Sequence, residues 1–366
     1  MSSHLSPSSD GSCTRLAPFG WDEQLARDFH SLHAPGTVPA RVIAEHRDRY
    51  VVRAAAGERA AVLAGRLRHH ASRREDLPAT GDWVAVDEGA GTAAIHAVLP
   101  RRSIFRRKAA GETTEAQVLA ANVDVALIAA ALPGDVNARR IERYLALAWE
   151  SGAVPVIVLT KADLVDDVDA AVRGVRAVAP GVDVAPVSAI TGAGVDALAR
   201  WLLPGRTAVL LGSSGAGKST LTNLLAGDDA LRTGTVRADG KGRHTTTHRQ
   251  LVQLRSGALL IDTPGMRELQ LWSADAGLES AFADVEALAA RCRYGDCAHQ
   301  AESGCAVRAA AQSGALDPAR LESWRRLRRE LAWLEIRQDQ AAAADERARV
   351  KTLHRAHRAH TRRKYG

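Results

Sequence analysis

The middle of the chain alternates between near-continuous apolar runs and segments with helical periodicity. The apolar runs are Val123–Leu132, Val154–Leu164, Val184–Ala189 and Thr207–Gly212. Apolar residues recur at helical spacing between these runs, over Asn137–Trp149, Asp167–Val178 and Val195–Leu202. Strands that are apolar on both faces and alternate with helices are typical of a parallel sheet covered by helices on its two sides. We therefore expect a central α/β domain over residues 111–275.

The region before this domain has a different pattern. Residues 1–38 are rich in Ser, Pro and Gly, which predicts a flexible leader. From Ala40 onward, short strand-like segments such as TGDWVAVDE are separated by turn residues. Short strands at this spacing predict a small β-barrel over residues 39–110.

Two connections of this barrel are strongly basic. An oligonucleotide-binding (OB) barrel would carry such charges at its rim for phosphate contacts, but a solvated surface has the same composition. Tyr50 and Trp83 are the visible candidates for base stacking, so the charge alone leaves both interpretations open. The basic residues are Arg66, Arg68, Arg73 and Arg74 beside His69 and His70, and Arg101, Arg102, Arg106, Arg107 and Lys108 after the last strand.

Bulk properties narrow the class of protein. The chain has 366 residues and a formal net charge of +7, which favours a polyanionic partner without identifying it. Its first residues lack the basic start and apolar stretch of a signal peptide, and no apolar run approaches the roughly 20 residues that span a membrane. We expect a cytoplasmic protein that does not bind membranes.

The strand predicted at Thr207–Gly212 leads into GSSGAGKST, which has the GxxxxGK[ST] spacing of a phosphate loop. Glycines let successive N–H groups and a helix N-terminus point at phosphate oxygens. Lys218 would lie along the β- and γ-phosphates and Ser219 would ligate Mg²⁺, so both are predicted catalytic residues. The predicted loop residues are Gly212, Ser213, Ser214, Gly215, Ala216, Gly217, Lys218, Ser219 and Thr220.

A TKAD tetrapeptide, Thr160 to Asp163, ends another predicted strand. In guanine-nucleotide sites the Asp of [NT]KxD accepts hydrogen bonds from guanine N1–H and N2–H₂, and the Lys stem, here Lys161, covers the ring. Adenine lacks these donors, so Asp163 would select GTP over ATP. Ser188 and Ala189 end the next strand and fit the backbone contact with guanine O6. Alone, TKAD could also be a helix cap.

A DxxG pattern, Asp262 to Gly265, follows a further apolar run. There Asp262 would hold Mg²⁺ through water, and the Gly265 N–H would contact the γ-phosphate. The polar segment GRHTTT lies between this pattern and the phosphate loop, and its Thr246 would offer a hydroxyl to the same ion. The predicted magnesium ligands are Ser219, Thr246 and Asp262.

The residue that orients the attacking water is not evident. Met266 follows Gly265, where many GTPases place a glutamine, and a thioether cannot orient water. Slow intrinsic hydrolysis is therefore expected. His244 is a candidate for this role, and a surface or structural histidine is an equally good interpretation.

The C-terminal region contains a cysteine cluster. Cys292, Cys297, His299 and Cys305 have the spacing C-x4-C-x-H-x5-C, which predicts a closed, tetrahedral structural zinc site. A long helix is expected from Pro318 to about Arg349. The last residues, KTLHRAHRAHTRRKYG, contain no acidic residue and are typical of an RNA-binding arm. Residues 276–366 are expected to form this zinc-binding and helical domain with its basic tail.

The order of the motifs is informative, because base recognition precedes the phosphate loop, whereas in an ordinary GTPase it follows. Circular permutation preserves a site built where parallel strands end. This order, with DTPGM and GRHTTTH beside GSSGAGKST, resembles the circularly permuted ribosome-small-subunit-dependent GTPase family. The similarity extends from TGDWV and PRRSIFRRKAAG to the cysteine cluster. Thr160 stands where many GTPases have Asn, which is expected to weaken the contact between the base loop and the phosphate loop.

The resemblance implies an OB barrel, a permuted GTPase core and a zinc module that together dock on the small (30S) ribosomal subunit and its 16S rRNA. It implies a monomer that hydrolyses GTP slowly alone and faster on the subunit, as a late checkpoint in subunit maturation. The alternatives are an RNA-binding zinc protein with nucleotide as a slow structural ligand, and a phosphate-loop ATPase acting on other polyanions. Asp163 disfavours ATP, and the permuted order with the zinc cluster disfavours a generic switch.

Overall fold

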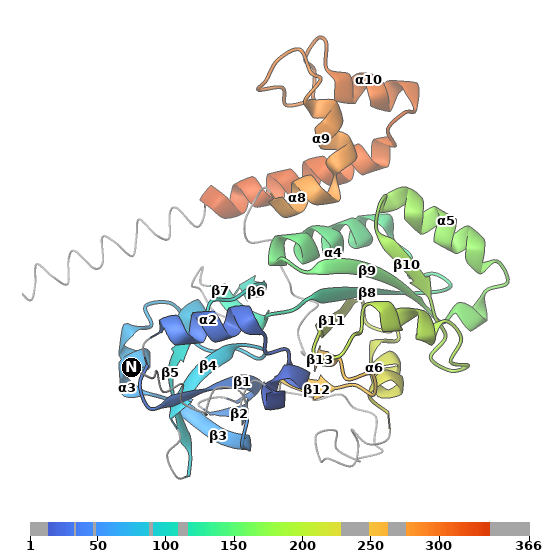
Figure 1. Cartoon of the computed structure of the whole chain (residues 1–366). Helices are drawn as coiled ribbons and strands as arrows, with labels where there is room; N and C mark the ends of the chain where they lie inside the picture. The colour runs from blue at the N-terminus through green and yellow to red at the C-terminus, as the bar shows by residue number, and fades with distance from the viewer. Residues whose placement is uncertain are drawn as a thin grey trace, which may run out of the picture.

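A computed structural model describes residues 14–32, 34–46, 49–87, 91–108, 116–227, 249–262 and 276–336. Figure 1 shows an N-terminal barrel beside an α/β core, with a C-terminal group of helices lying against the core on the side of α4. No helix in these ranges combines the length and the apolar character that crossing a bilayer requires.

Five strands form the barrel. The strand order β1-β2-β3-β5-β4 closes because β4 pairs with β1, and β3 and β5 pair in parallel. Alternate residues such as Val42, Val52 and Ile95 fill its interior. This five-stranded topology confirms the predicted OB-type barrel. The strands are β1 (Thr37–Glu45), β2 (Tyr50–Ala54), β3 (Gly57–Leu63), β4 (Trp83–Asp87) and β5 (Ala93–Val98), with α3 (Gly65–His70) and η2 (Arg74–Asp76) between β3 and β4.

Residues 14–32 depart from the predicted flexible leader. They form η1 (Ala17–Phe19) and α2 (Glu23–Ser31), and Leu16 and Leu25 are buried. Trp21 packs edge-on against Trp83 of the barrel, with 4.8 Å between ring centroids. Composition misled the prediction here, because a few spaced apolar residues are enough to fix a segment against an existing core.

The central domain contains a six-stranded sheet in the order β10-β9-β8-β11-β13-β12. The first five strands are parallel, as predicted, and β12 runs antiparallel to β13. The segment expected as a helix at Val195–Leu202 is the 3₁₀ helix η4 (Val195–Arg200). The other elements are the hairpin β6 (Ile104–Lys108) and β7 (Ala116–Ala121), β8 (Val125–Ala131), α4 (Ala138–Ser151), β9 (Val154–Thr160), η3 (Ala162–Leu164), α5 (Val168–Val178), β10 (Asp183–Pro186), β11 (Thr207–Gly212), α6 (Lys218–Ala226), β12 (Arg249–Gln253) and β13 (Leu259–Asp262).

The barrel and the core share one continuous sheet. Strand β12 pairs antiparallel with β1, with Ala44 opposite Gln250 and Glu45 opposite Arg249. The two sheets therefore join into eleven strands. This junction was not predicted, because a pairing between strands 200 residues apart leaves no local pattern.

A buried arginine reinforces the junction. Arg41 of β1 is 1% exposed, and its Nη2 donates to the Thr207 hydroxyl at 2.8 Å. The same guanidinium donates to the carbonyl groups of Phe19, Gly81 and Asn122. Burial lowers the pKa of Arg41 to about 10, so the group remains protonated at neutral pH. One side chain thus connects the barrel, the N-terminal segment and the first residue of β11.

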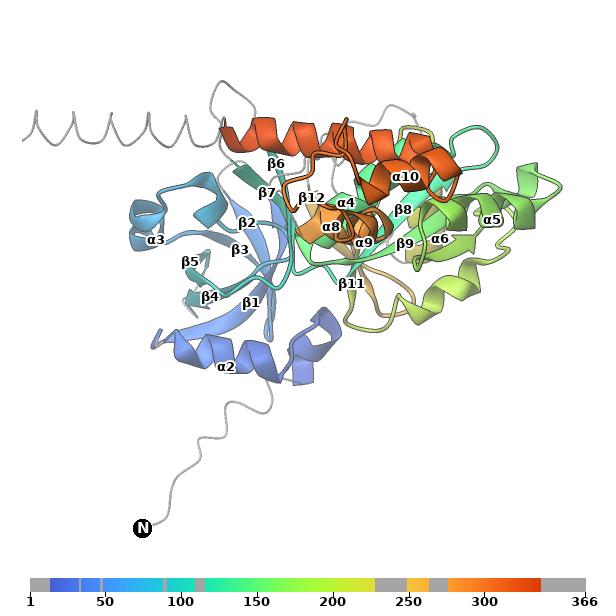
Figure 2. The same cartoon turned by 90° about the horizontal axis from the view of Figure 1, so that it is seen from above.

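The C-terminal module packs on helices of the core (Figure 2). Arg320 is 7% exposed and donates to Glu142 of α4 at 2.9 Å and to both carboxylate oxygens of Asp284 at 2.7 and 2.8 Å. Gly277 lies so close to α4 that a Cβ there would be 2.4 Å from the Ala146 carbonyl oxygen. The module comprises α8 (Ala276–Ala281), α9 (Ala283–Ala289), α10 (Ala306–Ser313) and a C-terminal helix described over residues 318–336.

Candidate nucleotide site and metal cluster

The predicted nucleotide motifs meet at one edge of the sheet. Gly212 of β11 lies opposite Ala129 of β8, and Ala131 of β8 lies opposite Thr160 of β9. All these strands are parallel and end at this edge, where β13 also ends at Asp262. Parallel strands of an open α/β sheet bind ligands at their carboxyl ends. The chain order of the motifs is therefore permuted while their spatial neighbours are retained.

The phosphate loop has the backbone that its glycines predict. Gly212, Gly215 and Gly217 have φ angles of 139°, 80° and 76°. A Cβ at Gly212 would lie 2.4 Å from the Ala129 carbonyl oxygen, so only glycine fits there. The Lys218 Nζ donates to the Gly212 carbonyl at 2.9 Å, which folds the lysine over the loop.

Helix α6 begins at Lys218, directly after the loop. Ser219 and Thr220 occupy its first turn and are exposed, as are Ser214 and Gly215 in the loop, whereas Ala216 is buried. N–H groups in the first turn of a helix have no partner within the helix and favour anions. The geometry thus suits phosphates bound by main-chain donors.

The base loop is tied to the phosphate loop. The Thr160 hydroxyl donates to the Ala216 carbonyl at 2.8 Å in a buried position. The sequence predicts that threonine makes this contact weaker than asparagine would, and the structure shows the contact as one hydrogen bond. The Ala162 N–H donates to the Val187 carbonyl at 3.1 Å, which joins the TKAD loop to the end of β10.

The proposed base contacts differ in exposure. Asp163 is exposed, and Lys161 has a left-handed φ of 56° that turns the chain after β9. Ser188 is buried, and its N–H donates to the Ala193 carbonyl at 2.9 Å. Since this donor is already used, Ala189 is the residue of the pair whose N–H is suited to guanine O6.

The sequence did not predict that Asp135 contacts the phosphate loop. The Ser213 hydroxyl donates to the carboxylate of Asp135 at 2.5 Å, and Asp135 forms an ion pair with Arg140 at 2.7 Å. Asp135 follows β8 in the chain. The strand order could have suggested it, because β8 lies directly beside β11.

Some predicted residues cannot be placed in this way. His244, Thr246 and Gly265 lie outside the described residues, and of Asp262 only the backbone is described. The basic tail also lies outside them. Their assigned roles remain predictions.

The four predicted metal ligands come together. The ligand atoms of Cys292, Cys297, His299 and Cys305 lie within 4.8 Å of one another. The Cys292 and Cys305 sulfurs are 3.9 Å apart, and each lies 3.5 or 3.4 Å from His299 Nδ1. A tetrahedral zinc ion with these ligand types gives sulfur–sulfur edges of about 3.8 Å and sulfur–nitrogen edges of about 3.5 Å. The donor set therefore fits a metal ion.

The surroundings act on two of the thiols in opposite directions, because the pKa of Cys292 is lowered whereas burial raises the pKa of Cys297 to about 11, and they fix the imidazole. Burial raises the pKa of Cys292, but backbone N–H groups of Val307 and Ala306 at the start of α10 outweigh it and lower the pKa. The His299 ring packs on Trp324 of the C-terminal helix, with centroids 5.3 Å apart. Trp324 in turn donates to Glu286 of α9 at 2.9 Å. The cluster is therefore built into the packing of the whole module.

Several barrel arginines have structural partners. Arg101 pairs with the fully buried Asp82 at 2.7 Å and also donates to the carbonyls of Glu75 and Leu77. Arg102 forms two hydrogen bonds of 2.6 Å with Asp22, the N-cap of α2. Arg101 thus braces the barrel at a buried carboxylate, whereas the half-exposed pair of Arg102 and Asp22 ties α2 to the segment after β5.

Comparison with known proteins agrees with this geometry. The family model of the RsgA GTPase matches residues 98–272. A protein of Opitutus terrae named small ribosomal subunit biogenesis GTPase RsgA is 49% identical over 95% of this chain and 98% of its own length. A protein of the same name from Streptomyces coelicolor is 47% identical over 94% of each chain. The chain belongs to the RsgA GTPase family.

Structural neighbours support the same fold. The crystal structure of YjeQ from Thermotoga maritima covers 81% of this chain and 99% of its own, with a TM-score of 0.62 and 25% identity. YloQ, described as a circularly permuted GTPase, has a TM-score of 0.60 over 82% of this chain at 21% identity. A model described as ABC transporter also matches residues 197–352, a range that contains the phosphate loop.

Membership of the RsgA GTPase family confirms the predicted resemblance and the permuted GTPase fold. It identifies the chain as a GTP hydrolase, with Mg²⁺ as the ion that accompanies GTP. Where the nucleotide binds, the residues that would hold this ion come from the start of α6 and the end of β13. The ion would neutralise charge on the β- and γ-phosphates.

Proposed function

We propose that this GTPase binds the small ribosomal subunit through its 16S rRNA and acts as a late checkpoint in subunit maturation. GTP would hold the docked state, and hydrolysis would favour release. The observation that carries the proposal is the 49% and 47% sequence identity, over nearly the full chain, with relatives named for small-subunit biogenesis. The shared sheet supports it physically, because β12 links an OB-type barrel to the nucleotide edge.

The cofactors of the proposal are one structural zinc ion in the Cys292 cluster and Mg²⁺ with GTP. Zinc suits three thiolates and one imidazole in a closed tetrahedron. We further propose a monomer that acts in the cytoplasm, with Lys218, Ser219 and Asp163 in their predicted roles. Slow turnover by the free protein follows from the absence of a glutamine after Gly265.

The first test is turnover of GTP and ATP by the purified protein, alone and with isolated small ribosomal subunits. We expect weak GTP turnover alone, strong stimulation by the subunit and little ATP turnover. GTP turnover that the subunit leaves unchanged would refute the checkpoint and favour the RNA-binding zinc protein with a structural nucleotide. Strong ATP turnover would refute the assignment of Asp163.

A matched variant tests the base contact alone. Asp163→Asn replaces an acceptor oxygen by an NH₂ donor, which suits the C2 carbonyl of xanthine and not the amino group of guanine. We expect GTP affinity to fall by at least tenfold and affinity for xanthosine triphosphate to rise. Unchanged GTP affinity would mean that Asp163 does not contact the base.

A further inference from the structure

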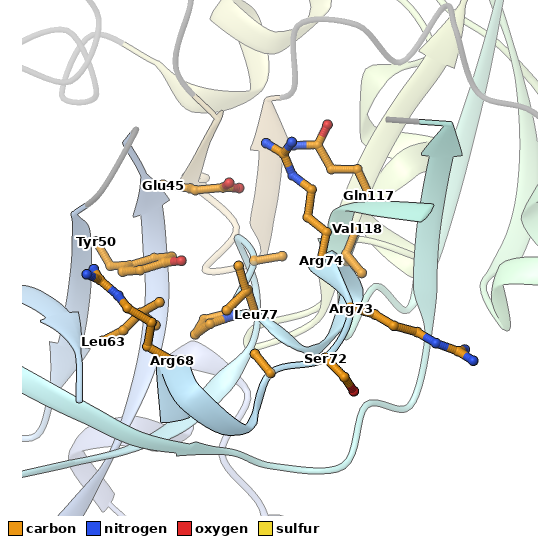
Figure 3. A pocket seen from close by; sticks show the side chains of 13 residues that line it. Glu45, Tyr50, Leu63, Arg68, Ser72, Arg73, Arg74, Leu77, Gln117 and Val118 are labelled. Atoms are coloured by element: carbon orange, nitrogen blue, oxygen red, sulfur yellow. The ribbon is translucent and has the colours of Figure 1, made fainter. Parts of the chain in front are cut away.

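The barrel carries a pocket of about 460 Å³ that none of the nucleotide or metal residues lines. It lies between the ends of β1 and β2, helix α3 with the segment after it, and strand β7 (Figure 3). Its apolar members include Leu63, Leu77 and Val118. The volume falls in the range of about 300–1,000 Å³ that is usual for small-ligand sites.

Two arginines line this pocket from different sides. Arg68 comes from α3 and Arg74 from η2, and Figure 3 shows both among the side chains that line the pocket. Both arginines are exposed, and neither guanidinium group has a hydrogen-bond or ion-pair partner among the residues that the structure describes. Arg73 also lines the pocket, but it pairs with Glu75 at 3.4 Å, and in Figure 3 its guanidinium points away.

This arrangement differs from that of the arginines after the barrel. Arg101 and Arg102 are committed to Asp82 and Asp22, and Arg106 lies 3.6 Å from Glu75. The structure therefore separates cations that stabilise the barrel from cations that remain available for a ligand. Two of the available arginines, Arg68 and Arg74, line the same pocket. A solvated surface alone gives no reason for this arrangement.

The other lining groups suit a nucleobase. Tyr50 lines the pocket and is 7% exposed, and aromatic rings stack on bases of any sequence. Glu45 carries acceptor oxygens for the polar edge of a base, and Gln117 offers its NH₂ donor, since its side-chain oxygen accepts from Arg107 at 3.2 Å. Two separated guanidinium groups match the phosphates on the two sides of one nucleotide within a strand.

We infer that this pocket binds one unpaired nucleotide of an RNA strand. Its base lies against Tyr50, and its two flanking phosphates face Arg68 and Arg74. The inference rests on the proposed binding of rRNA. A strand is favoured over a free nucleotide because the exposed arginines leave the pocket open at its rim, where a chain can enter and leave. A paired base is excluded because its faces are covered by its neighbours in the stack.

The test uses the full chain and a single-stranded oligoribonucleotide that carries one 4-thiouridine. Ultraviolet cross-linking, mapped by mass spectrometry, should place this base at Tyr50 or its pocket neighbours. Arg68→Ala and Arg74→Ala should each weaken binding by about tenfold and abolish the cross-link. Each should also reduce the dependence of log K on log salt by about 0.7 for the lost phosphate contact. Arg66→Ala is the matched control, because Arg66 lies on α3, is exposed and does not line the pocket.

Three results would overturn the inference. Equal losses in all three variants would indicate diffuse charge, and equal cross-linking of a blunt duplex would remove the need for an unpaired base. Competition by uridine monophosphate at the concentration of the oligonucleotide would assign the pocket to free nucleotides. Stimulation of GTP turnover by the small subunit is measured in parallel on the wild type. If that stimulation is absent, the proposed function fails; if it is present while the pocket variants bind RNA normally, only the pocket fails.

Discussion

A buried arginine joins the GTPase core to the barrel, and another joins it to the C-terminal module. The two arginines differ in the groups that accept their hydrogen bonds. At the barrel junction, the described acceptors of Arg41 are three carbonyl groups and one hydroxyl, and none is a carboxylate. At the C-terminal junction, Arg320 contacts the carboxylates of Asp284 and Glu142. Burial acts to lower the pKa of both arginines. It prevails at Arg41, whereas the two carboxylates outweigh it and raise the pKa of Arg320.

The two junctions also meet different halves of the nucleotide site. The barrel contacts β12 and the first residue of β11, the strand that leads into the phosphate loop. The C-terminal module contacts α4 and α5, and the loops that would bind the base follow the neighbouring strands β9 and β10. One sheet thus connects the phosphate side of the site to the barrel, while the module packs beside the base side. The first junction uses backbone pairing and a buried arginine, and the second uses the ion pairs of Arg320.

The largest expected effect is loss of the metal. Cys297→Ala, or chelation, should release zinc and unfold the module around His299 and Trp324, since structural zinc contributes on the order of 10 kcal/mol to such sites. Zinc content by mass spectrometry and hydrogen exchange would measure this. The barrel should keep its exchange protection, because its junction contains no metal ligand. A wild-type protein without stoichiometric metal would contradict the prediction. Faster hydrogen exchange in the barrel after chelation would mean that the two junctions do not differ in their dependence on the metal.

The next effect is loss of Arg320. Arg320→Ala leaves Glu142 buried without its cation, which typically costs about 3–5 kcal/mol of unfolding free energy. Arg320→Lys keeps the charge but cannot form all the hydrogen bonds, so it should recover part of the loss. Urea denaturation of both variants would measure the difference. A loss below about 1 kcal/mol in the alanine variant would show that the junction does not depend on this arginine.

Sequence patterns predicted the parts of the fold that depend on local periodicity. The runs at Val123–Leu132 and Thr207–Gly212 became β8 and β11, and the glycines of the phosphate loop adopt the predicted backbone. The four residues of the predicted cysteine motif also lie close together in the structure. These features were predictable because each one is encoded within a few consecutive residues.

The junctions were not predictable in the same way. Arg41 and Arg320 are ordinary basic residues in the sequence, and their burial depends on partners from distant segments. The pairing of β1 with β12 and the contact of Asp135 with Ser213 have the same long-range origin. The number of basic residues in the sequence likewise could not predict that Arg101 forms a buried ion pair and that Arg68 does not. The sequence shows how many basic residues the chain has, and the packing of the folded chain determines which of them form ion pairs.

Arg41→Met should have a smaller effect than Arg320→Ala. Methionine fills similar volume, and the variant leaves acceptors such as the Thr207 hydroxyl without their donor but strands no carboxylate. Unsatisfied buried polar groups cost about 1–3 kcal/mol. Urea denaturation under the same conditions measures the loss, and Arg53→Met, at a partly exposed residue paired with Glu58, is the surface control. A loss equal to that of Arg320→Ala would mean that the two junctions have the same energetic basis.

The smallest effects distinguish the two carboxylates around Arg320. Burial raises the pKa of Glu142, so the folded state disfavours its ionised form. Burial also acts to raise the pKa of Asp284, but its hydrogen bonds with Arg320 outweigh this and lower it. The stability that ionised Asp284 contributes is therefore present above its unfolded pKa near 3.8 and is lost as pH falls through the lower folded value.

Asp284→Asn should consequently destabilise the protein by at least about 1 kcal/mol at pH 7, since the ion pair is lost and one of the two oxygens that accept from Arg320 becomes an NH₂ donor. Glu142→Gln keeps an oxygen for Arg320 and removes a charge that burial disfavours, so it should change the stability less or increase it. The free energy of unfolding of the two variants is measured by urea denaturation at pH 7 and pH 5. Both pH values lie above the unfolded pKa of either carboxyl group, so both groups are mostly ionised in the unfolded wild-type chain. If Glu142→Gln proved the more damaging, the C-terminal junction would depend on a charge buried in α4, and Asp284 would serve only to orient the guanidinium.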